Sequence, residues 1–267
     1  MEKAMENREF YIDSDGIRLH AKLDFPQKQQ EKYPLAVIVH GFTGHMEEDH
    51  IRLLAEALCD HNFAALRVEL YGHGGSGGRF EDHTMLKWLS EILDVIDYAK
   101  ALPFAGGLYL LGHSAGGLAT VLAGGIRHNA LRAIVPMSPA INIRDGALTG
   151  DMLGASFDPA DIPDEIFFPA DDDVAAGLML RGNYVRVAQF LPVEAAAAAF
   201  CGPVLIIHAD TDETVPVQCA IDLAGHYADA RLVITKDDTH CYDNHLDVTI
   251  REIVQFLEAV RDDAVCG

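Results

Sequence analysis

The sequence predicts an α/β fold built on a mostly parallel, doubly wound sheet, and three observations lead to it. Short apolar runs alternate with longer segments of helical period along most of the 267 residues, which is the pattern of repeated strand–helix units. The runs are rich in β-branched residues, as is typical of strands that a parallel sheet buries on both faces. With 49% hydrophobic and 23% charged residues, the chain has the composition of a protein with a sizeable core.

The elements can be assigned in chain order. Residues 9–12 and 17–25 alternate apolar and polar side chains and predict an opening antiparallel pair. Strands of the buried type follow at residues 35–40, 64–70, 108–113, 131–138, 204–210 and 231–236. Segments with helical period lie at residues 48–60, 84–99, 115–127, 217–227 and 245–260. In the second of these, Met85, Leu89 and Ile92 fall on one face of a helix.

Residues 140–192 interrupt this alternation. The segment contains four prolines and scattered glycines, and no strand signal is visible in it. An interruption of this length within a compact domain is usually functional. We therefore expect residues 1–267 to form a single domain, with a cap at about 140–192 inserted between two strands of the sheet.

Charge and cysteine usage exclude several classes of function. Lys and Arg number 20 against 41 Asp and Glu, a net charge of −21, which disfavours binding to nucleic acid or to an anionic membrane. The five cysteines form no CxxC pair, so neither a disulfide framework nor a zinc site is suggested. No apolar leader and no run of 18 apolar residues is present. The sequence predicts a cytoplasmic protein and leaves open whether it forms a homodimer.

The clearest chemical signal is Gly112-His113-Ser114-Ala115-Gly116. A strand of the buried type runs directly into this segment and a helical pattern follows it, as in the nucleophile elbow of serine hydrolases. A serine hydroxyl needs a base and an orienting acid, which follow in the order Ser, acid, His. His240, after the strand at 231–236, is the candidate base. Asp212, after the strand at 204–210, is the candidate acid, and Asp210 is the alternative.

The oxyanion of the reaction needs two backbone N–H groups. The candidates are the N–H of Ala115, directly after the serine, and that of Phe42, in the glycine-containing turn after the strand at 35–40. No cofactor and no metal is expected, because neither GxxxxGK[ST] nor HExxH occurs. The segment Gly72–Gly77 fits GxGxxG, but no helix pattern opens from it, which argues against a nucleotide site.

Several motifs together resemble the α/β-hydrolase serine esterases, and more finely the small bacterial feruloyl (cinnamoyl) esterases. The broader resemblance is carried by His40-Gly41-Phe42-Thr43-Gly44, Tyr71-Gly72-His73-Gly74, Gly112-His113-Ser114-Ala115-Gly116-Gly117 and Asp212-Glu213-Thr214-Val215-Pro216. The finer one is carried by Phe80-Glu81-Asp82-His83-Thr84, Gly182-Asn183-Tyr184-Val185-Arg186-Val187-Ala188-Gln189 and Thr239-His240-Cys241-Tyr242-Asp243. It extends over roughly residues 9–260.

The resemblance implies a single α/β-hydrolase domain whose cap forms one wall of an aromatic acyl pocket. The partner it implies is a small aromatic ester. It also implies that Tyr184 hydrogen-bonds the phenolic hydroxyl of the substrate, with Asp145 as an acidic partner. Ala115 stands where such enzymes more often have Gln; since only its N–H is needed, catalysis is unaffected.

Other interpretations remain open from the sequence. The chain could be a general short-acyl carboxylesterase or a serine peptidase of the same fold. A non-catalytic binding protein is disfavoured, because candidates for all three members of the triad stand in order. Cys241 beside His240 is either a packing residue or a redox-sensitive neighbour, and the sequence does not decide between these roles.

Overall fold

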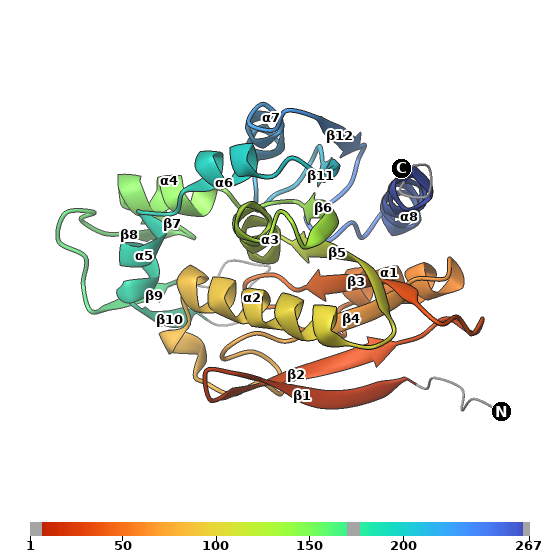
Figure 1. Cartoon of the computed structure of the whole chain (residues 1–267). Helices are drawn as coiled ribbons and strands as arrows, with labels where there is room; N and C mark the ends of the chain where they lie inside the picture. Colours follow the sequence, from red (N-terminus) through yellow and green to blue (C-terminus); the bar gives the residue numbers. More distant parts are fainter. Residues whose placement is uncertain (1–6, 170–176, 264–267) are drawn as a thin grey trace.

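The computed structural model describes residues 7–169 and 177–263, and its centre is one eight-stranded sheet (Figure 1). The strands are β1 (Arg8–Ser14), β2 (Ile17–Asp24), β3 (Tyr33–Val39), β4 (Ala64–Val68), β5 (Ala105–His113), β6 (Leu131–Met137), β11 (Val204–Ala209) and β12 (Ala230–Thr235). They lie in the order β1-β2-β4-β3-β5-β6-β11-β12. Every pair from β4 to β12 is parallel, and β1 and β2 add an antiparallel edge. The predicted mostly parallel sheet is confirmed.

Helices cover both faces of the sheet, and β3 shows why. Its side chains alternate between two buried clusters: Leu35 and Val37 belong to one, Ala36 and Ile38 to the other. Strands in such a position are apolar throughout because neither face meets water. The helices are α1 (Asp49–Asp60), α2 (Met85–Ala101), α3 (Ala115–Ile126), α7 (Gln218–Ala224) and α8 (Leu246–Asp263).

The helical periods of the sequence match this packing. Along α2, Trp88 and Ile92 are completely buried in the cluster that also holds Leu118 of α3. On the opposite face, Ile51 of α1 packs in one cluster with Leu257 of α8. The helix α2 begins where expected, because the hydroxyl of its N-cap residue Thr84 accepts the otherwise free N–H of Lys87 at 3.2 Å.

The segment between β6 and β11 contains the cap, which gathers at one end of the molecule in Figure 1. Its elements are α4 (Asn142–Thr149), β7 (Asp151–Met152), β8 (Ala155–Ser156), β9 (Glu165–Phe168), β10 (Leu178–Arg181), α5 (Asn183–Ala188) and α6 (Val193–Ala199). The expectation of no strands here was wrong, since two short antiparallel hairpins form. Strands of two to four residues are too short to leave a readable alternation. Residues 170–176 of the predicted cap lie outside the described residues.

The parallel strands place the candidate residues at one edge. β5, β11 and β12 run in the same direction, so their carboxyl ends meet where ligand sites of open α/β sheets form. Ser114 directly follows β5, and Asp212 and His240 lie in the loops after β11 and β12. Within the described residues, no helix is long and apolar enough to cross a membrane.

Candidate active site

Ser114 occupies a tight turn between β5 and α3. Its backbone has φ 56° and ψ −119°, a strained conformation that residues with a side chain rarely adopt. Small neighbours make the turn possible. A Cβ added to Gly112 would lie 2.2 Å from the carbonyl oxygen of Gly116, and one added to Gly116 would lie 2.3 Å from that of His40. The N–H of Ser114 donates to the carbonyl of Met137 at 2.8 Å. This strand, turn and helix have the geometry of the expected nucleophile elbow.

Asp212 and His240 face each other across the edge of the sheet. His240 Nδ1 lies 2.8 Å from Asp212 Oδ2. Because an ionised carboxylate only accepts hydrogen bonds, Nδ1 carries the hydrogen and Nε2 keeps its electron pair. Asp212 Oδ1 accepts the N–H groups of Thr214 at 2.9 Å and Val215 at 2.7 Å, which fixes the rotation of the carboxylate. The arrangement leaves His240 Nε2 as a proton acceptor.

The charge on Asp212 is strongly favoured. The side chain is fully buried, and burial raises its pKa, but hydrogen bonds led by those from His208 and His240 outweigh burial and hold the pKa well below its usual range. His208 Nε2 lies 3.2 Å from Asp212 Oδ2 and 2.9 Å from the carbonyl oxygen of Val215. Since that carbonyl only accepts, His208 Nε2 carries a hydrogen and is oriented towards the carboxylate.

The loop that carries His240 is held from several sides. Asp237 and Tyr242, which flank it, have φ of 53° and 62°. The carbonyl of His240 accepts a hydrogen bond from His113 Nε2 at 2.9 Å, and the ring centroids of these two histidines are 4.6 Å apart. Because His113 directly precedes Ser114, this contact brings the candidate base to the same place as the candidate nucleophile.

The backbone of the predicted oxyanion hole lies beside Ser114. A Cβ added to Gly41 would be 3.2 Å from Ser114 Cβ, so the turn that leads to Phe42 passes close to the serine. The ring of His40 fixes this turn, because its Nδ1 lies 2.7 Å from the carbonyl oxygen of Gly41 and its Nε2 accepts a neighbouring backbone N–H at 3.0 Å. Ala115 is the first residue of α3, so its N–H lies outside the hydrogen-bond ladder of the helix.

Comparisons with known proteins decide the family. Residues 30–157 match the family model described as serine aminopeptidase, S33. A structure of Est1E from Butyrivibrio proteoclasticus with ferulic acid bound is 46% identical, covers 95% of this chain and 99% of that chain, and gives a TM-score of 0.90. This chain belongs to the α/β-hydrolase serine esterases.

Two further solved structures are similar to this esterase, and a comparison with curated proteins found no match. A second structure of Est1E from the same organism is 43% identical with a TM-score of 0.87, covering 95% of this chain and 99% of that chain. The mouse α/β-hydrolase domain-containing protein 10, at 17% identity and a TM-score of 0.79 over 95% of this chain and 99% of that chain, shares the fold. Among curated proteins, none matches the sequence.

Aromatic side chains surround the predicted oxyanion residue Phe42. Its ring centroid lies 5.5 Å from Phe80, 5.3 Å from His83 and 5.6 Å from Tyr184, the last contributed by α5 of the cap. The cap of this esterase therefore adds a ring to the wall next to the serine turn. Tyr184 is completely buried, and its hydroxyl has no hydrogen-bond partner among the described residues. Burial raises the pKa of Tyr184, which keeps it a neutral hydrogen-bond donor.

Asp145, the other residue suggested for substrate contact, has different surroundings. It lies on α4 with its carboxylate mostly exposed, at 3.6 Å from Arg144 Nε. Arg144 in turn holds Glu194 of α6 through both of its terminal nitrogens. Together these side chains line a surface groove with Ile141 and His226. The structure thus brings Tyr184 to Phe42, whereas it gives Asp145 an ion-paired position at the surface of the cap.

Sequence reasoning missed two histidines whose side chains contact the proposed catalytic residues, His208 at Asp212 and His113 at the carbonyl of His240. His208 and His113 lie in strands that read as continuous apolar runs, where a single histidine gives no signal of its own. Their roles follow from contacts across the sheet, which only a three-dimensional arrangement reveals. Among the described residues, one group could hold a metal ion, formed by His50, His113 and Cys241.

Proposed function

We propose that this esterase hydrolyses esters of hydroxycinnamic acids such as ferulic acid, with Ser114 as nucleophile, His240 as general base and Asp212 as the residue that orients His240. The observation that carries the proposal is the 2.8 Å contact between His240 Nδ1 and the buried carboxylate of Asp212, at the same sheet edge as the strained turn of Ser114. The bound ferulic acid of Est1E, at 46% identity, supports the class of acyl group.

In the first half of the reaction, Ser114 Oγ attacks the ester carbonyl while His240 Nε2 takes the hydroxyl proton. Asp212 keeps Nδ1 protonated, so that Nε2 is the basic atom, and its negative charge stabilises the imidazolium. The N–H groups of Phe42 and Ala115 stabilise the oxyanion as the carbonyl becomes tetrahedral. His240 then returns the proton to the departing alcohol, and the acyl group remains on Ser114.

The second half reverses these roles with water. His240 Nε2 removes a proton from a water molecule, whose oxygen attacks the acyl carbonyl in the same oxyanion hole. Collapse of the tetrahedral intermediate breaks the bond to Ser114 Oγ, and His240 returns the proton to the serine. The carboxylic acid leaves and the enzyme is restored. Every protein group that takes part belongs to the chain itself, and the sequence of steps requires no cofactor.

The aromatic wall beside Phe42 supports recognition of an aromatic acyl group. Rings of Phe42, Phe80 and Tyr184 offer edge and face contacts of the kind that hydroxycinnamate rings prefer. The hydroxyl of Tyr184 has no protein partner among the described residues, so it is free to donate to a phenolic oxygen. Because Tyr184 is completely covered in this structure, the proposal requires the surrounding rings to move when the substrate enters.

A serine peptidase is the second candidate, because the family model that matches residues 30–157 is described as serine aminopeptidase. The acylation chemistry is the same for an amide, so the site geometry alone does not separate the two. The matched segment contains Ser114 but ends before Asp212 and His240, and it includes only the first part of the cap. The cap wall around Tyr184 therefore favours the aromatic ester.

A substrate panel tests the proposed function directly. We expect kcat/KM for methyl ferulate to exceed that for p-nitrophenyl butyrate, once the greater intrinsic reactivity of the nitrophenyl ester is corrected by its rate of alkaline hydrolysis. An aminoacyl-β-naphthylamide should turn over negligibly. Equal corrected rates for the two esters would assign a general esterase, and preferred cleavage of the naphthylamide would assign a peptidase.

We also propose that the enzyme works in the cytoplasm on a small molecule and without nucleic acid. Its described cysteines Cys59, Cys201, Cys219 and Cys241 are all free thiols, which suits a reducing compartment. A net charge of −21 opposes binding to polyphosphates.

A further inference from the structure

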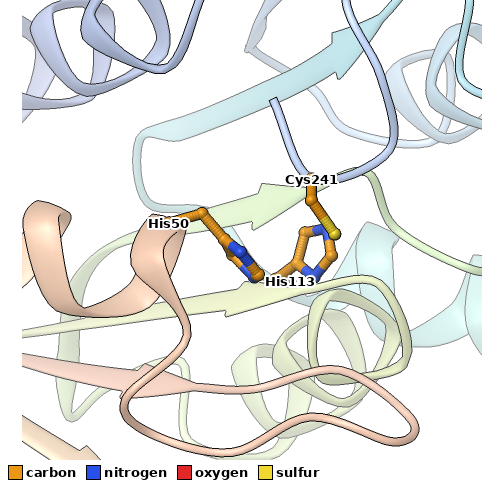
Figure 2. Close-up of side chains that lie close together, drawn as sticks. All are labelled: His50, His113 and Cys241. Carbon is orange, nitrogen blue, oxygen red and sulfur yellow. The ribbon is translucent and has the colours of Figure 1, made fainter. Parts of the chain in front are cut away.

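Three side chains with metal-binding atoms meet directly behind the proposed catalytic residues. Figure 2 shows His50 from α1, His113 from the end of β5 and Cys241 from the loop after β12. One ligand atom from each lies within 4.8 Å of the other two. His113 precedes Ser114 and Cys241 follows His240, so the group is joined to the active site by covalent bonds on two sides.

His50 has an unsatisfied polar atom in this group. The residue is only 4% exposed, and its Nε2 has no hydrogen-bond partner among the described residues. Its ring packs against His113 with centroids 4.3 Å apart. Burial, together with the neighbouring His240, lowers the pKa of His50 to about 4, so the ring is neutral at physiological pH. Buried polar atoms are nearly always paired, and a neutral imidazole nitrogen without a partner is the form that binds a metal.

His113 has one nitrogen committed and one free for coordination. Its Nε2 lies 2.9 Å from the carbonyl oxygen of His240. A carbonyl oxygen only accepts, so Nε2 carries the hydrogen and the electron pair of the neutral ring is on Nδ1. Histidines that bind metals commonly donate their other N–H to a backbone carbonyl in this way.

Cys241 has surroundings that suit a cation better than a redox role. Burial, followed by the charges of Glu48, Asp243 and other carboxylates, raises the pKa of the thiol to about 12. Little thiolate forms under these conditions, so the residue is a poor redox sensor. The same carboxylates stabilise a divalent cation, and Glu48 Oε2 lies 3.9 Å from His50 Nε2. Cys241 itself is half-buried, so its side chain is partly exposed to solvent.

We propose that His50, His113 and Cys241 bind one divalent cation of the zinc class, next to His240. Two imidazoles and a thiolate are the donors that zinc and cobalt prefer over the hard cations magnesium and calcium. Tetrahedral zinc holds nitrogen and sulfur ligands roughly 3.3–3.8 Å apart, so ligand atoms that lie within 4.8 Å of one another need to close by no more than roughly 1–1.5 Å. On binding, the thiol of Cys241 loses its proton to solvent and sulfur donates its electron pair to the metal, with no change in oxidation state.

Occupancy of this site acts on the esterase through His240. The loop that holds the cation through Cys241 also carries His240, and closing it moves the catalytic imidazole. A divalent charge close to that ring also opposes formation of the imidazolium that the reaction needs. Bound metal therefore inhibits hydrolysis. This consequence rests on the proposed role of His240, whereas metal binding itself does not.

The test is titration of the tag-free, reduced enzyme with Co²⁺, followed by absorption. We expect one Co²⁺ per chain and a near-ultraviolet thiolate-to-cobalt band that Zn²⁺ abolishes by displacement. Cys241→Ser and His50→Gln should each lose the band, while Cys201→Ser, which removes an exposed thiol elsewhere, should keep it. Circular dichroism identifies any variant that fails to fold, and the other variant then decides. Absence of the band in the wild type, or its persistence in both folded variants, would overturn the site.

Activity gives the second readout. Saturating Zn²⁺ should lower kcat for methyl ferulate by about tenfold or more in the wild type. Cys241→Ser should keep its own metal-free rate under the same conditions. A cobalt band without loss of activity would refute the coupling to His240 and leave the site itself standing. Inhibition without the band would show that zinc acts elsewhere, for example at some of the chain's other histidines, of which it has 13 in total including His50 and His113, and would overturn the proposal.

Discussion

Replacing Asp212 with Asn is the substitution whose effect the site geometry defines most sharply. Asp212 Oδ1 accepts two backbone N–H groups, from Thr214 and Val215, at 2.9 and 2.7 Å. An asparagine must keep its carbonyl oxygen there, because its amide nitrogen would face two donors. The NH2 group then occupies the position of Oδ2, which faces His240 Nδ1. Since the NH2 group only donates, Nδ1 must accept, and the hydrogen moves to Nε2.

The wrong tautomer of His240 cannot take the proton of Ser114. Loss of the correct tautomer in a serine triad costs about 10³–10⁴ in kcat, which is about 4–5.5 kcal/mol of transition-state stabilisation. The fold should persist, because an isosteric side chain keeps both backbone hydrogen bonds. We therefore expect Asp212→Asn to lower kcat for methyl ferulate by that factor with little change in KM.

The matched control is Asp210→Asn. Asp210 lies two residues away and was the alternative acid from sequence, but its carboxylate contacts Lys236 Nζ at 3.1 Å and the N–H of Asp237 at 2.7 Å. A partly exposed ion pair of this kind contributes little, so kcat should stay within about threefold of wild type. The measurement is kcat for methyl ferulate in both purified variants, each checked for its fold by circular dichroism. If Asp212→Asn keeps a tenth of the activity or more, or if Asp210→Asn is equally damaged, the tautomer argument is refuted.

Three further predictions concern stability and substrate choice. Gly116→Ala places a Cβ 2.3 Å from a backbone oxygen and should lower the free energy of unfolding in urea by about 3 kcal/mol or more. Gly124→Ala in the same helix meets a flexible Ile134 methyl at 3.1 Å and should change that free energy by no more than about 1 kcal/mol. Equal losses of stability in the two variants would contradict this prediction. Burial raises the pKa of Glu91 from 4.5 to about 7, so the stability that Glu91 contributes is present below pH 4.5 and is lost as pH rises through 7. Glu91→Gln should therefore gain up to about 3 kcal/mol of stability relative to wild type between pH 5 and 8. Melting temperatures of the two proteins that change with pH in parallel would refute the raised pKa of Glu91. Tyr184→Phe should lower kcat/KM for methyl ferulate about tenfold and leave methyl cinnamate, which lacks the phenol, unchanged; equal losses on both would show a packing role.

The sequence predicts the sheet and the three proposed catalytic positions because each depends on local pattern and chain order. Ser114 was recognisable since a strand, a serine between glycines and a helix follow without a gap. Asp212 was preferred to Asp210 by its position in the loop, and it is Asp212 that contacts His240 in the structure. The doubly wound sheet follows from runs long enough to show their period.

What the sequence did not predict depends on contacts between distant segments. The hairpins of the cap are held by pairs such as Ile166 with Leu180, and strands of four residues have no readable period. His208 supports Asp212 across a turn, and His50 of α1 contacts His113 at the end of β5. A single polar residue in an apolar run gives no sign of the partner that it will meet.

The most direct test of the central claim is the turnover of methyl ferulate by Ser114→Ala. Among the described residues, no hydrogen bond of the serine side chain holds the turn together. The turn is anchored by the backbone N–H of Ser114, which donates to the carbonyl of Met137. The variant should therefore fold like the wild type. We predict that it loses nearly all turnover, by about 10³-fold or more in kcat. A folded Ser114→Ala variant that retains most of the wild-type rate would contradict the account.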